Sequence, residues 1–114
     1  MKLAAKEINE EITHLVQLIA QCENDDDIFS SSEKFQKHTH KIKGLAPMMG
    51  KEDLGELSGT MDSILKKIID GDKVEGMFSA MTESIPLMEK SMTESDLNLS
   101  DFKNTVSKIL DSLD

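Results

Sequence analysis

Apolar side chains recur at steps of three and four residues through most of the chain, in five separate stretches. This spacing places them along one side of an α-helix, whereas a half-buried strand would alternate apolar and polar residues. Two clear stripes are Ile8, Ile12, Leu15 and Ile19, and Leu54, Leu57, Met61, Leu65 and Ile68. The pattern therefore predicts an all-α protein.

Local signals set the expected helix boundaries. Ser30 with Glu33, and Asp72 with Glu75, have the spacing of capping boxes, and Gly50 is a natural helix stop. A loop is expected over 23–27, and Pro86 should kink or split the helix that contains it. Helices are expected over roughly 4–21, 31–50, 51–70, 72–92 and 100–113. The 114 residues then suit a single domain, 1–114, folded as an antiparallel four-helix bundle with an additional C-terminal fifth helix.

Charge and cysteine content limit the possible partners and location. The formal net charge is −9, which disfavours binding to nucleic acid or to anionic membrane surfaces. The single cysteine, Cys22, rules out an intramolecular disulfide, and no apolar run reaches the roughly 20 residues of a membrane span. A cytoplasmic, monomeric domain without cofactor or metal is expected.

Two of the three histidines lie in the segment HTHKIKG, and a helical wheel separates them. With Phe35 set at zero on the core side, His38 falls near 300°, at the edge of the core stripe. His40 falls near 140° and Gly44 near 180°, both facing away from the core. Because they point apart, His38 and His40 do not form a metal site on one helix. His40 has no structural explanation and is therefore the candidate reactive group.

The neighbours of His40 favour anion chemistry. Lys43, one turn later, can neutralise a bound anion, and Gly44 leaves clearance around the imidazole, with close helix packing as the competing explanation. On the helix over 51–70, Gly55 and Gly59 share a face with Asp62 and Lys66. If this face lies beside His40, Asp62 can accept a hydrogen bond from one ring nitrogen and leave the other nitrogen as a nucleophile.

The segment HTHKIKGLAPMMG resembles the phosphoacceptor segment of histidine phosphotransfer (HPt) domains, whose core is His-x-x-Lys-Gly. Here that core is His40, Lys43 and Gly44. The resemblance is closest to the N-terminal phosphotransfer domain of CheA-type chemotaxis kinases. LGELSGTMDSILKKI looks like the second helix of that domain, and the resemblance covers nearly the whole chain.

The resemblance implies that His40 accepts a phosphoryl group from a histidine kinase ATP-binding domain. It then passes this group to an aspartate of a response-regulator receiver domain. In the CheA group a glutamate on the next helix orients the histidine, and the matching position is Asp62. Asp is shorter than Glu, a histidine found in related domains is replaced by Gly59, and Pro47 should bend the helix after the motif.

The chain is not a kinase by itself, because it has no nucleotide-binding motif. Three interpretations remain open. The chain is the phosphoacceptor module of a CheA-type kinase, a stand-alone HPt protein of a hybrid-kinase phosphorelay, or a helical adaptor that acts without phosphorylation.

Overall fold

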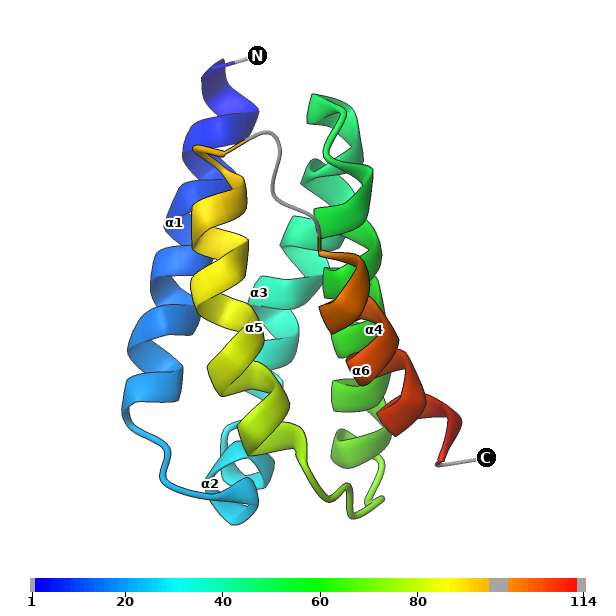
Figure 1. Ribbon diagram of the computed structural model, residues 1–114. Helices are drawn as coiled ribbons and strands as arrows, with labels where there is room; N and C mark the ends of the chain where they lie inside the picture. Colours follow the sequence, from blue (N-terminus) through cyan, green and yellow to red (C-terminus); the bar gives the residue numbers. More distant parts are fainter. Residues whose placement is uncertain (1, 95–98, 113–114) are drawn as a thin grey trace.

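The structure, a computed structural model, describes residues 2–94 and 99–112, and every regular element within these ranges is helical (Figure 1). The all-α prediction is therefore confirmed. The elements are α1 (Lys2–Ala20), α2 (Asp25–Ser30), α3 (Ser32–Leu45), the 3₁₀ turn η1 (Pro47–Met49), α4 (Glu52–Ile69), α5 (Met77–Ser91) and α6 (Ser100–Asp111). None of the described helices is both long enough and apolar enough to cross a membrane.

Helix α3 lies between α1 and α4 and contacts both of them. Its most extensive packing is against α4. On its other side it contacts α1, which in turn packs against α5, while α6 lies mainly on α4 (Figure 1). Side chains at one edge of the buried face of α3 therefore lie near α1, and side chains at the opposite edge lie near α4.

The predicted apolar stripes form one buried core. Phe35, which the helical wheel placed on the core side, is fully buried, as are Ile42 on α3 and Ala46 just after it. The methionines of the fourth predicted helix, Met77, Met81 and Met88, are buried in the same cluster. The last predicted helix was expected to reach residue 113, and Leu113 lies outside the described residues. Helix α6 ends at Asp111.

The loop expected over 23–27 is wrong from Asp25 onward, because α2 begins there and continues to Ser30. The Asn24 side chain accepts a hydrogen bond from the Asp27 N–H at 3.0 Å and caps the helix. Three aspartates occupy the first turn, where negative charge is favourable near the helix N-terminus. Runs of Asn and Asp predict loops and caps equally well, so the short helix was missed.

Neither predicted capping box forms. Ser30 ends α2, and α3 starts at Ser32 without a side-chain cap. Helix α5 begins at Met77 rather than Asp72, and its N-terminal N–H groups are bound by a distant carboxylate. Asp25 accepts hydrogen bonds from the N–H of Gly76 at 3.1 Å and of Phe78 at 2.7 Å. A cap supplied across more than 50 residues leaves no local sequence signal.

The two prolines have different effects on their helices. Pro47 does not bend a longer helix; α3 ends at Leu45 and the chain continues as η1. Gly50 then adopts φ 75° and ends η1, whereas α3 itself ends before the predicted boundary. Pro86 does not split its helix, because α5 continues through it. Pro86 and Thr82 are both exposed, so water can satisfy the Thr82 carbonyl that the proline leaves without an N–H partner.

Candidate functional site

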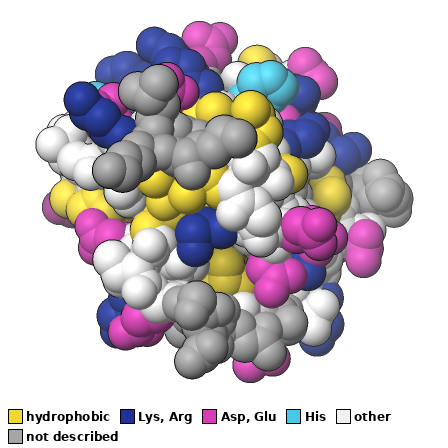
Figure 2. Space-filling view, turned by 90° about the horizontal axis from the view of Figure 1, so that it is seen from above, with side chains coloured by type: hydrophobic (Ala, Val, Ile, Leu, Met, Phe, Trp, Pro, Cys, Tyr) yellow, Lys and Arg dark blue, Asp and Glu magenta, His cyan; other side chains and the backbone are white. Residues whose placement is uncertain are grey.

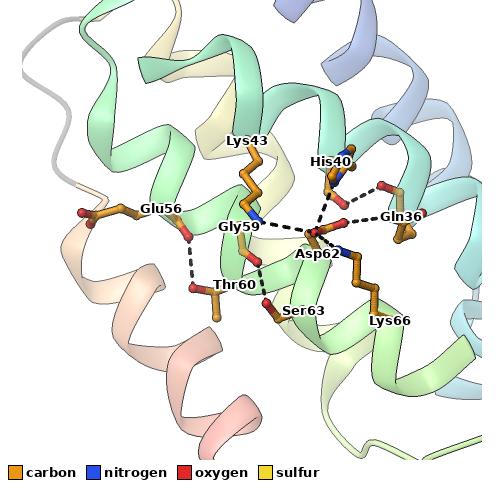
Figure 3. A network of polar contacts seen from close by, with 10 residues as sticks. Gln36, His40, Lys43, Glu56, Gly59, Thr60, Asp62, Ser63 and Lys66 are labelled. Atoms are coloured by element: carbon orange, nitrogen blue, oxygen red, sulfur yellow. Dashed lines mark hydrogen bonds and ion pairs between the residues drawn. The ribbon is translucent and has the colours of Figure 1, made fainter. Parts of the chain in front are cut away.

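His40 lies on the exposed side of α3 and faces a buried carboxylate on α4 (Figure 3). Its Nδ1 atom is 3.4 Å from Oδ2 of Asp62. The imidazole is 57% exposed, whereas the Asp62 side chain is only 1% exposed. The placement of α4 beside His40, assumed from the glycine face, is therefore present in the structure. It gives a solvent-accessible ring anchored to a carboxylate that water does not reach.

Asp62 is surrounded by donors from both helices. Gln36 Nε2 donates to Oδ1 at 2.7 Å, and Lys66 Nζ lies 3.2 Å from Oδ2. Lys43 Nζ is 3.9 Å from the same Oδ2 atom. Figure 3 shows these side chains converging on the carboxylate from α3 and α4. The predicted residues His40, Lys43 and Asp62 thus come together around one buried anion.

The surroundings of Asp62 keep it charged. Burial by itself would raise the pKa of this carboxyl, but hydrogen bonds from Gln36, Lys66 and His40 lower it, and the net pKa is below its usual value. An ionised carboxylate accepts hydrogen bonds and cannot donate one. A neutral His40 that bonds to Asp62 therefore carries its proton on Nδ1. The lone pair of Nε2 is then available on the other side of the ring.

The glycines around the site have different explanations. A Cβ at Gly55 would lie 3.0 Å from Pro47 Cδ, so close packing against η1 accounts for this glycine. A Cβ at Gly59 would lie 3.5 Å from the Lys43 side chain, which covers it. A side chain longer than that of alanine at this position would therefore meet Lys43. At Gly44 a Cβ would meet nothing within 4 Å, so close helix packing does not explain that residue.

His38 forms a second histidine–carboxylate pair on the opposite side of α3. Its Nδ1 atom is 3.0 Å from Oε1 of Glu11 on α1, and Lys41 Nζ is 3.5 Å from the same oxygen. The His14 ring stacks on His38 with 4.8 Å between centroids. Burial would raise the pKa of Glu11, but the His38 hydrogen bond and the charges of His38 and Lys41 lower it overall. His38 is a half-buried packing residue, as its place on the wheel predicted.

An open hollow of about 640 Å³ lies between α1 and α3, beside His40. Its lining is predominantly acidic on the α1 side and comprises Glu7, Glu10, Glu11, His40, Lys41, Gly44 and Leu45. His40 therefore stands between an acidic wall and the lysines that border Asp62. Among the described residues no group of three or more His, Cys, Asp or Glu side chains is arranged to hold a metal ion.

Sequence reasoning missed the role of two residues. Gln36 lies four residues before His40 and therefore on the same side of α3, but an amide carries no charge pattern that marks a site. Lys66 lies four residues after Asp62, and this spacing correctly placed it on the same face of the helix as Asp62. No role was predicted for it. Comparisons of the chain with protein-family models, with characterised proteins and with solved structures give no match.

Proposed function

We propose that this chain is a histidine phosphotransfer domain of the kind found in CheA-type chemotaxis kinases, with His40 as the phosphoacceptor. The observation that carries the proposal is the exposed His40 ring, whose Nδ1 faces the buried Asp62 carboxylate at 3.4 Å. The match of His40, Lys43 and Gly44 to the His-x-x-Lys-Gly motif supports it independently. A four-helix bundle formed by α1, α3, α4 and α5, with α6 as an additional helix, is part of the same proposal.

In the first step, Nε2 of His40 attacks the γ-phosphorus of ATP held by a kinase ATP-binding domain. The N–P bond forms as the P–O bond to ADP breaks, and ADP leaves. The Nδ1 proton stays between the ring and Asp62, whose negative charge balances the positive charge that develops on the imidazole. Lys43, which extends over Gly59 beside the ring, offsets the charge of the phosphoryl group.

In the second step, a carboxylate oxygen of a receiver aspartate attacks the phosphorus. The N–P bond breaks, an acyl phosphate forms on the receiver, and the Nε2 lone pair of His40 is restored. The exposure of the His40 ring is consistent with approach by two different partner domains in turn. A stand-alone phosphotransfer protein would use the same site and the same two steps.

The test is phosphorylation by a CheA-type kinase core with labelled ATP. Wild type, His40→Gln and His38→Gln are compared, the last as a matched control two residues away. We expect acid-labile, base-stable label on wild type and on His38→Gln, and none on His40→Gln. A receiver domain added afterwards should remove the label from both labelled proteins. Label that persists on His40→Gln would contradict the assignment. If several kinase cores label none of the proteins, the adaptor interpretation is favoured.

A further inference from the structure

The shortest of the polar contacts around Asp62 comes from a residue outside the phosphotransfer motif. Gln36 Nε2 lies 2.7 Å from Oδ1, compared with 3.2 Å for Lys66 and 3.4 Å for His40, both of which contact Oδ2. Gln36 stands one turn before His40 on α3 and is partly buried. The two oxygens of Asp62 therefore have separate partners, an amide on one and cationic or imidazole groups on the other.

We propose that Gln36 is the positioning residue of this site: by binding Oδ1, it fixes the plane of the Asp62 carboxylate so that Oδ2 faces Nδ1 of His40. His40 is thereby held in the tautomer with its proton on Nδ1 and a free Nε2. The consequence for phosphotransfer rests on the proposed function, whereas the effect on the His40 tautomer does not.

Competition for Oδ2 explains why such a residue is needed. Lys66 is closer to Oδ2 than His40 is, and Lys43 approaches the same atom at 3.9 Å. A carboxylate held only by its own Cβ could rotate toward these ammonium groups and away from the ring. With Oδ1 bound to Gln36, rotation would break a short hydrogen bond to a buried charged group, which is costly.

The short side chain of Asp62 gives a second reason. Asp has one methylene fewer than Glu, so its carboxylate stays near the α4 backbone and reaches His40 only at 3.4 Å. At this separation a small rotation removes the hydrogen bond altogether. A glutamate at 62 would extend toward the ring and depend less on an external partner. The His40 site should therefore depend on Gln36 when residue 62 is aspartate, but much less when it is glutamate.

The first test measures the tautomer of His40 by ¹⁵N NMR at a pH where the ring is neutral. Wild type is compared with Gln36→Ala and with Gln17→Ala, the same change at an exposed position of α1. We expect mainly the Nδ1–H form in wild type and Gln17→Ala, and a shift toward the Nε2–H form in Gln36→Ala. An unchanged His40 tautomer in a folded Gln36→Ala protein would overturn the proposal.

The second test measures the rate of His40 phosphorylation by a CheA-type kinase core in a double-mutant cycle. Gln36→Ala should slow the reaction on the order of 10-fold, the lower end of the losses seen when outer partners that orient metal-binding histidines and carboxylates are removed. In the Asp62→Glu background the same change should have little effect. Equal losses in both backgrounds would overturn the proposal. If Asp62→Glu does not fold, as judged by its thermal unfolding, the tautomer measurement decides.

The two tests separate the possible failures. Absence of label on wild type with several kinase cores would count against the proposed function and leave the tautomer result standing by itself. Label on wild type, with the same rate and the same tautomer in Gln36→Ala, would refute the role of Gln36 and leave the proposed function intact.

Discussion

Helix α3 carries two histidine–carboxylate pairs that have the same chemical groups but differ in distance and in solvent exposure. His38 binds Glu11 at 3.0 Å and is 14% exposed, while His40 faces Asp62 at 3.4 Å and is 57% exposed. In both pairs the ring presents Nδ1 to a carboxylate that is at most 10% exposed. A histidine beside a buried carboxylate is therefore not enough to mark a reactive group. What distinguishes His40 is that its ring remains open to an approaching partner.

The two-residue separation produces this difference. Side chains two apart on a helix point about 160° away from each other, so one histidine turns toward α1 and the other toward the α4 side. His38 meets the His14 ring and becomes part of the packing between helices. His40 faces the buried Asp62 of α4, where the glycine at 59 leaves room for Lys43, and it also borders the open hollow beside α1. The same local sequence thus supplies one structural histidine and one accessible histidine.

The largest expected difference is in stability. His38→Ala removes the hydrogen-bond partner of the buried Glu11 carboxylate, which keeps only the longer contact to the exposed Lys41, and removes the ring that stacks on His14, so we expect a loss of about 1–3 kcal/mol in the free energy of unfolding. His40→Ala removes an exposed ring, and Asp62 keeps Gln36 and Lys66 as partners, so we expect a change of less than about 0.5 kcal/mol. Urea unfolding of both variants measures the contrast. Equal losses would show that the two pairs contribute alike to the fold.

Gly44 offers a sharper test of accessibility around His40. Because a Cβ at this position meets nothing within 4 Å, Gly44→Ala should stabilise α3 by up to about 1 kcal/mol. If clearance for a partner is the role of this glycine, the same variant should be phosphorylated more slowly by the kinase core. Thermal unfolding and the labelling rate are measured on one preparation. A stabilised protein that is labelled at the wild-type rate would remove Gly44 from the site.

The smallest effect is on acid stability, and both carboxylates should contribute. Asp62 and Glu11 have pKa values lowered in the folded protein, so each binds protons more weakly there than in the unfolded chain. Their stabilisation is complete above the unfolded-state pKa values, about 4, and is lost as the pH falls through the lowered folded-state values.

Asp62→Asn and Glu11→Gln should each flatten the fall in unfolding free energy between about pH 5 and pH 2. Urea unfolding across this range, with exposed Glu7→Gln as control, measures the slope. A slope unchanged in Asp62→Asn would contradict the charged state assigned to this carboxylate.

Periodicity predicted the helices and the two histidine faces because both depend only on residue spacing. It placed Phe35 in the core and His40 outside it. It failed where distant groups decide the local structure. The start of α5 depends on Asp25, which is distant in sequence, and the short helix α2 is stabilised by an Asn cap in a segment typical of loops.

For the site, too, residue spacing predicted part of the arrangement and missed the rest. The motif identified His40 and Lys43, and the shared face of Gly55 and Gly59 located Asp62 beside them. The division of the two Asp62 oxygens between Gln36 and His40 depends on ångström-scale placement across two helices. No spacing rule contains that information. The sequence therefore predicted that His40, Lys43 and Asp62 lie together, but not that Gln36 binds the Asp62 carboxylate.

The most direct measurement of the central claim is site mapping after chemical phosphorylation with phosphoramidate, which needs no partner kinase. Histidines modified in the folded wild type are identified by mass spectrometry at successive times, and ¹H–³¹P NMR identifies the ring nitrogen. The account predicts phosphate on Nε2 of His40 and none on His38, whose ring is half-buried against α1. Phosphate on His38 with His40 unmodified would contradict it.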